Sequence, residues 1–145
     1  MKIDLSKANF NKDECEYMKK ETEILQEKNP NHIPILIMIK SNVLKIDKQK
    51  FLVSNNIVFS DFITNTLKKK LIGLHTDDSL DIYTVKLNSE SNQKIESTKI
   101  NVNSLSIKDI YNEFKDESTN LLILKVSRTT TYKYVKGSVK YWLGY

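Results

Sequence analysis

Residues 21–71 read ETEILQEKNPNHIPILIMIKSNVLKIDKQKFLVSNNIVFSDFITNTLKKKL, and the order of segment types within them decides the fold. Pro30 disfavours helical geometry at Asn29, so a charged helix is expected to end there. The nearly continuous apolar run over 33–39 is typical of a strand covered on both faces. After a turn, residues 46–53 predict a second strand, antiparallel to the first, and a second helix follows.

Capping and helix-ending residues delimit the two helices that flank these strands. Asn11 and Glu14 form a capping-box pattern at the start of the first helix. The inner face of that helix is expected to carry residues at spacings of three and four: Cys15, Met18, Thr22 and Leu25. Ser60 is expected to cap the second helix and Gly73 to terminate it.

The rest of the chain predicts three more elements. Residues 80–87 have the β-rich content of a third strand, and the polar stretch 88–99 is expected to form a mobile loop. A short helix capped by Ser106 and a final buried strand over 121–126 follow. The order ββαβ, short helix, β is that of a β-grasp (ubiquitin-like) domain, in which the first and last strands lie side by side in the centre of the sheet.

We therefore expect an α+β chain in three parts. These are an N-terminal helical extension over 1–28, a ubiquitin-like β-grasp domain over 29–128 and a basic C-terminal tail over 129–145. The net charge is +5, and no acidic residue follows Glu117, so the last segment carries the excess of positive charge. Such a tail is suited to nucleic acid or an anionic membrane, and a solvated surface is the plainer interpretation.

The composition excludes several classes of protein. The single cysteine, Cys15, excludes an internal disulfide framework and a Cys-rich zinc site. No apolar run reaches the roughly 18 residues that span a bilayer, and the N-terminus lacks a signal-peptide core, so we expect an intracellular chain that is soluble as translated. No motif joins Cys15 to His32 or His75, and no P-loop, G-x-G-x-x-G or H-E-x-x-H pattern occurs. We predict no enzyme activity, no cofactor and no metal site.

Two short motifs carry a resemblance to a known family. The run PNHIPILI over 30–37 and the run DKQKFLV over 47–53 resemble the motifs Ile-Pro-Val-Ile-Val and Asp-Lys-x-Lys-Phe-Leu-Val of the autophagy ubiquitin-like modifiers of the GABARAP type. The resemblance covers residues 21–126. It implies a small protein tag that is joined to a membrane lipid. It also implies that the second strand is an exposed edge, to which a peptide motif, aromatic-x-x-aliphatic with nearby acids, adds as another strand.

The resemblance further implies two hydrophobic pockets for the two anchoring side chains of that motif. The first would be lined by Glu21, Leu25, Pro34, Leu36, Lys50, Leu52 and Leu121. The second would be lined by Phe51, Val53, Ile57, Phe62 or Ile63, and Leu67. Lys48 and Lys50 would meet the acidic residues of the ligand. The alternative is that these apolar residues belong to the core, and for Leu36 and Leu121 this is partly expected. Binding of about −8 kcal/mol, in the micromolar range, is expected.

The chain departs from the family pattern at several positions. The Tyr before the first Pro is Asn29, the Pro after Phe-Leu-Val is Ser54, and the Phe on the last strand is Leu121. The helix after Ser60 contains one residue more than the family pattern, so each assignment beyond Val53 has an alternative one position away.

The C-terminal segment holds the expected site of conjugation. Family members finish in aromatic-Gly, and the carboxylate of that glycine is activated as an adenylate, passed as a thioester and transferred to the amine of phosphatidylethanolamine. The equivalent position in this chain is Lys133. Gly144 is the first candidate for conjugation, with Tyr145 removed by a processing cysteine protease, and Gly137 is the second. The remaining alternative is a tail that is not conjugated.

These features predict a ubiquitin-like autophagy modifier of the cytoplasm and the autophagosome membrane, to which it would be attached peripherally through phosphatidylethanolamine. Its expected partners are autophagy receptors and adaptors that carry short linear motifs, the activating and conjugating enzymes of the lipidation pathway, and the processing cysteine protease. Two alternatives stay open. One is an unconjugated, soluble paralogue that acts as a peptide-motif adaptor, and the other is a basic β-grasp module that binds nucleic acid, a partner we do not expect.

Overall fold

The computed structural model describes residues 2–6, 9–40, 43–75, 78–87 and 96–129. In chain order its elements are α1 (Lys12–Lys28), β1 (His32–Ile39), β2 (Lys45–Ile46), β3 (Lys50–Ser54), α2 (Phe59–Asp61), the π-helical segment η1 (Phe62–Leu67), α3 (Lys68–Lys70), β4 (Leu71–Ile72), β5 (Leu80–Lys86), β6 (Glu96–Ile100), α4 (Ile107–Phe114) and β7 (Leu122–Arg128).

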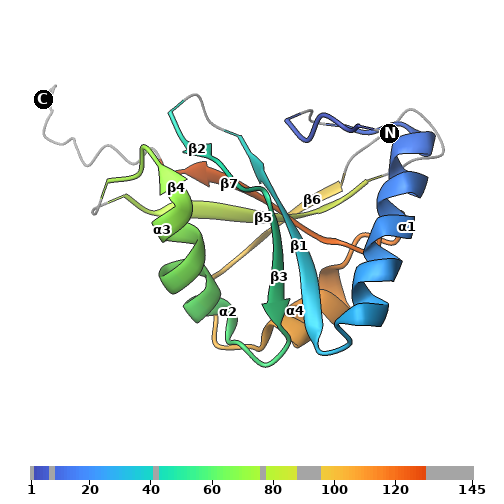
Figure 1. The fold of residues 1–145 in the computed structure, drawn as a ribbon. Coiled ribbons are helices and arrows are strands. Elements are labelled where there is room, and N and C mark those ends of the chain that lie inside the picture. The colour runs from blue at the N-terminus through green and yellow to red at the C-terminus, as the bar shows by residue number, and fades with distance from the viewer. Residues whose placement is uncertain (1, 7–8, 41–42, 76–77, 88–95, 130–145) are drawn as a thin grey trace, which may run out of the picture.

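The sheet has the topology of a β-grasp domain. Five strands lie in the order β3-β1-β7-β5-β6, and a separate pair, β2-β4, extends beside them (Figure 1). The first and last strands, β1 and β7, pair in parallel from Ile35–Leu122 to Ile39–Val126, whereas the other pairs of the sheet are antiparallel. The predicted β-grasp fold and the central β1-β7 pair are confirmed.

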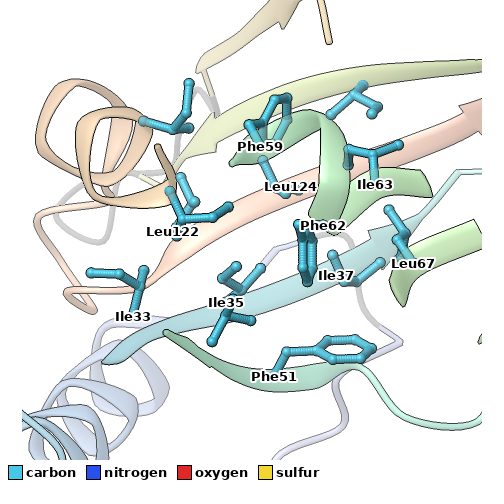
Figure 2. Close-up of a cluster of buried hydrophobic side chains, with 14 of the residues drawn as sticks. Ile33, Ile35, Ile37, Phe51, Phe59, Phe62, Ile63, Leu67, Leu122 and Leu124 are labelled. Atoms are coloured by element: carbon cyan, nitrogen blue, oxygen red, sulfur yellow. The ribbon is translucent and has the colours of Figure 1, made fainter. Parts of the chain in front are cut away.

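Both faces of β1 are covered, which explains its continuous apolar sequence. Side chains alternate across a strand, so Ile33, Ile35 and Ile37 enter the larger core cluster, with the helical residues over 59–67 and α4. Leu36 and Met38 enter a smaller cluster on the opposite face, where α1 packs. Figure 2 shows the larger cluster, with Phe59, Phe62 and Ile63 on the helical side of β1 and β7.

The first helix begins and ends where the sequence predicts. The side chain of Asn11 accepts a hydrogen bond from the Glu14 N–H, and Glu14 accepts one from the Asn11 N–H, so the capping box is formed. The helix ends at Lys28, before Pro30. The α4 helix also has its predicted cap, because the Ser106 hydroxyl accepts from the Asp109 N–H.

The prediction of Ser60 as a helix cap is wrong. The second helix begins at Phe59 after Val58, which makes no side-chain capping bond. Two N–H groups of its first turn have no acceptor within the helix. The Phe59 N–H donates instead to the carbonyl of Leu105 at 2.7 Å, and the Ser60 N–H donates to the carbonyl of Asn103 at 3.0 Å. A distant loop therefore caps this helix, and no local residue pattern could have indicated it.

The same helix widens into a π-helical segment over Phe62–Leu67. The Lys68 N–H donates to the carbonyl of Ile63, five residues earlier, and the apolar side chains of η1 remain buried. A π-helical turn holds more residues than an α-helical one, and Phe62 and Leu67, at the two ends of this segment, both remain in the core. The helix ends at Lys70, and Leu71 belongs to β4.

Two further predictions about strands need correction. The single strand expected over 46–53 is divided into β2, which pairs with β4, and β3, which pairs with β1. Residues 96–99 of the expected loop belong to β6, while residues 88–95 lie outside the described structure. Because β6 is an exposed edge strand held through its backbone, it needs no apolar alternation, and its polar sequence gave no strand signal.

Gly73 follows β4 and does not terminate the helix directly, but its conformation requires glycine. Its φ angle is +96°, and a Cβ at this position would collide with the carbonyl oxygen of Val43. We expect Gly73→Ala to lower the free energy of unfolding by about 1–3 kcal/mol, the usual cost of a strained backbone conformation. Urea denaturation measures this loss, and an unchanged midpoint would contradict the assignment of strain to this residue.

Candidate functional site

A cavity of about 460 Å³ opens between α1 and the β1-β3 edge of the sheet. Six of the seven residues predicted for the first pocket line it: Glu21, Leu25, Pro34, Lys50, Leu52 and Leu121. Lys48, which was expected to meet the acidic residues of the ligand, and Phe51, which was assigned to the second pocket, also line it. The seventh residue, Leu36, is fully buried in the smaller core cluster beneath the opening.

The helix and the strands each contribute one wall of this cavity. The α1 wall follows from helical periodicity, since Met18, Glu21, Thr22 and Leu25 recur at spacings of three and four. Leu25 of α1 and Leu52 of β3 both line the cavity, and 41% and 37% of their surfaces are exposed, whereas Pro34 is buried. Such partly exposed aliphatic side chains around an opening are suited to hold an apolar group of a ligand.

Four residues of the lining were not predicted. They are Met18, Thr22, Ile24 and Ile35. The periodicity of the first helix had placed Met18 and Thr22 on the face of Leu25, so this signal was available in the sequence. Ile24 is an exposed side chain beside that face, and Ile35 belongs to the larger core cluster, so nothing in their sequence context distinguished them.

The rim of the cavity is predominantly basic. The Lys50 Nζ lies 3.5 Å from the Glu21 Oε1, which joins β3 to α1 through an ion pair whose side chains are each about half exposed. An exposed pair of this kind contributes only about 0.2–1 kcal/mol, so it can exchange partners at small cost. The Lys48 Nζ lies 5.3 Å from the centre of the Phe51 ring. Lys48 and Lys50 thus offer two cations at one edge.

β3 is the terminal strand of the sheet beside this cavity. It pairs with β1 on one side, and in the described structure no strand pairs with its other side. Its side chains alternate, so that Lys50 and Leu52 are exposed while Phe51 and Val53 are buried. An edge strand of this kind presents backbone N–H and C=O groups to an added strand.

The residues predicted for the second pocket lie mostly in the core. Phe51, Val53, Phe62, Ile63 and Leu67 are all buried in the larger cluster, and only Ile57 is partly exposed. The rings of Phe51 and Phe62 meet edge to face with centroids 5.9 Å apart (Figure 2). A second ligand side chain could enter here only by displacing this packing.

The next features concern metal-ligating side chains, the single thiol and membrane-spanning helices among the described residues. Within these ranges, no group of three or more His, Cys, Asp and Glu side chains is placed to hold a metal ion. Cys15 is buried, and this burial raises the pKa of its thiol, which disfavours the nucleophilic thiolate. No described helix is both long enough and apolar enough to cross a membrane. The conjugation candidates Gly144 and Gly137, and Tyr145, lie outside the described residues.

Comparison with known proteins assigns the chain to a family. The β-grasp topology of the sheet defines the class of ubiquitin-like proteins, and α1 is an addition that packs on the second face of the sheet. Residues 17–133, most of the chain, match the family described as autophagy protein Atg8, ubiquitin-like, and the chain therefore belongs to the Atg8 family. Members of this family are ubiquitin-like modifiers that act with the autophagy machinery.

A solved structure supports this assignment. The chain is similar to the protein in the crystal structure of Trypanosoma brucei ATG8, with 26% sequence identity and a TM-score of 0.62. The match covers 81% of this chain and 90% of that chain. No protein with a curated description matches the sequence.

Proposed function

We propose that this Atg8-family chain is conjugated through Gly144 to phosphatidylethanolamine on autophagosomal membranes, where it recruits cargo receptors and adaptors. The ligand would be a short aromatic-x-x-aliphatic motif with nearby acidic residues. One observation supports the proposal for binding: an apolar cavity, a strand edge that no described strand covers, and two lysines occur together at β3.

Each part of the motif has a counterpart at this site. The peptide backbone would pair with the free edge of β3, and its aromatic side chain would enter the cavity between Leu25 and Leu52. Its acidic residues would lie near Lys48 and Lys50, with Lys50 exchanging Glu21 for the ligand. The aliphatic side chain of the motif would displace the packing around Phe51 and Phe62.

Anchoring would make these modest contacts effective. Two acyl chains attached at Gly144 amount to a stable membrane anchor. Many anchored copies then raise the effective concentration of docking sites, so that micromolar contacts hold a multivalent receptor firmly. The activating and conjugating enzymes and a processing protease that removes Tyr145 would be the remaining partners, and the chain would divide between the cytoplasm and the autophagosome membrane.

Removal of two β3 side chains tests the docking site. We expect Lys50→Ala with Leu52→Ala to weaken binding of an acidic aromatic-x-x-aliphatic peptide by about 30- to 100-fold, because one apolar anchor and one cation are lost. Isothermal titration calorimetry measures the affinity. A matched control, Lys99→Ala with Ile72→Ala, removes an exposed ion-paired lysine and an aliphatic side chain that is 51% exposed, both away from the cavity.

Two outcomes would refute this docking site. One is equal affinity of the wild type and the β3 double variant, and the other is an equal loss in the control.

The dependence of affinity on salt concentration separates motif docking from the nucleic-acid alternative. Binding to nucleic acid falls steeply with salt concentration, whereas motif docking of this mainly apolar kind is expected to persist at moderate salt.

A further inference from the structure

A second cavity, of about 670 Å³, lies on the same face of the sheet as α1 but beyond the region that α1 covers. Met38 of β1, Lys125 of β7 and Val85 of β5 line it from three neighbouring strands. Met38 and Lys125 are register partners, so their side chains project from the same face. The Atg8-type docking site does not include any of these residues.

The borders of this cavity are held in place by hydrogen bonds. Leu5 forms part of one border, and the connection between β1 and β3 forms another. The Gln49 Nε2 donates to the carbonyl of Leu5 and to the carbonyl of Ile37, at 3.0 Å each. These bonds fix Leu5 against the sheet, so the cavity is lined by residues that are distant in sequence.

Positive charge gathers at this cavity. Lys40, Lys45 and Lys125 line it, and Asp47 is the single carboxylate of its lining. Within the described structure none of these lysines forms an ion pair. The Lys125 Nζ donates to the Ser97 hydroxyl at 3.0 Å and lies over the Tyr83 ring. Burial, and then repulsion from Lys40, lowers the pKa of Lys125, so an anion beside both ammonium groups would be stabilised.

The available polar groups favour a ligand without a peptide backbone. The floor of the cavity is a sheet face, whose backbone groups already pair between strands. The NH2 group of the Gln49 side chain donates to two carbonyls, and the Ser97 hydroxyl accepts from Lys125. A buried peptide would leave its own N–H and C=O groups without partners, whereas an apolar chain with one anionic group would not.

We infer that this second cavity binds a long-chain fatty acid. Its carboxylate would lie between Lys125 and Lys40, and its alkyl chain would extend over Met38 and Val85 towards Leu5. The volume is within the range of about 300–1,000 Å³ that is usual for small-molecule sites. This binding is independent of peptide docking and of conjugation.

Methionine methyl signals distinguish the two cavities directly. Met38 lines the second cavity and Met18 the first, so the full chain labelled with ¹³C-methyl methionine has one reporter in each. Titration with dodecanoate below its critical micelle concentration is expected to shift the Met38 signal saturably and to leave Met18 unchanged. Dodecyltrimethylammonium, with the same chain and the opposite charge, is expected to leave both signals unchanged.

Three variants complete the test. Lys40→Met with Lys125→Met is expected to weaken dodecanoate binding at least tenfold, while Lys108→Met, an exposed lysine of α4, leaves it unchanged. Asp47→Asn removes the competing carboxylate and is expected to strengthen binding several-fold, which a misfolded protein could not do. The inference is overturned if Met38 shows no saturable shift, if the cationic amphiphile binds equally well, or if the double lysine variant binds dodecanoate like the wild type.

Discussion

Gly144→Ala is expected to abolish recovery of the chain with membranes. Conjugation requires the C-terminal carboxylate of a glycine in a narrow catalytic channel, and an added Cβ both fills that channel and restricts the backbone. Intact mass of the protein recovered from the membrane fraction of its own cells measures the modification. The wild type is expected to lack Tyr145 and to carry the added mass of phosphatidylethanolamine, and the variant is expected in the soluble fraction only.

The other glycine of the tail provides the matched control. Gly137→Ala changes a glycine seven positions earlier and is expected to leave conjugation at Gly144 intact. If Gly137→Ala alone abolishes membrane recovery, the conjugated residue is Gly137. If the wild type is found only as a soluble chain that still ends in Tyr145 under starvation, conjugation is refuted and the soluble peptide-motif adaptor becomes the function.

Asp116→Ala is expected to lower the free energy of unfolding by about 3–5 kcal/mol. The side chain is 1% exposed and accepts three hydrogen bonds: from the Leu87 N–H, the Ser118 hydroxyl and the Thr119 hydroxyl. Its removal leaves a buried N–H without a partner and releases the turn before β7. Each bond to a charged group contributes about 1.5–3 kcal/mol. Such a loss is a large part of the 5–15 kcal/mol typical of a domain.

Urea denaturation checks this value, with two comparison variants. Asp116→Asn retains an acceptor for the Leu87 N–H and should lose less. Asp81→Ala removes a carboxylate from the surface ion pair with Lys99 and is expected to cost at most about 1 kcal/mol. If Asp116→Ala costs no more than Asp81→Ala, Asp116 does not organise the turn.

The turn before β7, which contains Asp116 and Asn120, also connects the core to the cavity between α1 and β3. Asn120 has a φ of +60°, and its carbonyl accepts a hydrogen bond from the Tyr111 hydroxyl at 2.8 Å. The Tyr111 hydroxyl in turn accepts from the Gln26 amide of α1 at 2.9 Å. Leu121, the next residue, lines the cavity. The position of one cavity wall relative to the other is therefore set by bonds that run from α1 through α4 to the turn.

The sequence predicted those elements whose ends and burial depend on interactions between residues close together in the chain. The Asn11 capping box, the helix end before Pro30 and the doubly buried run of β1 each depend on residues close together in the chain. Six residues that the resemblance assigns to the first pocket lie around one cavity, where a helix face meets a strand edge. Their role in binding stays a prediction.

The features that the sequence did not predict depend on distant contacts. The helix at Phe59 is capped by carbonyls from residues 103 and 105, more than forty positions away. The polar strand β6 exists because β5 offers it a backbone ladder, which leaves no apolar pattern to detect. The second cavity includes Leu5, which a hydrogen bond from Gln49, forty-four positions away in the sequence, holds against the sheet.

The pairing of β1 with β7 has a consequence for biosynthesis. The ribosome completes β7 roughly 90 residues after it completes β1, so the pair of β1 with β7 is among the last contacts of the sheet to form. Until then, the six consecutive buried side chains of β1 lack their permanent neighbours. Any chain cut short ahead of β7 would keep that segment unpaired and open to self-association. The β1 segment is therefore the part of the growing chain with the greatest need of protection until β7 is free to pair with it.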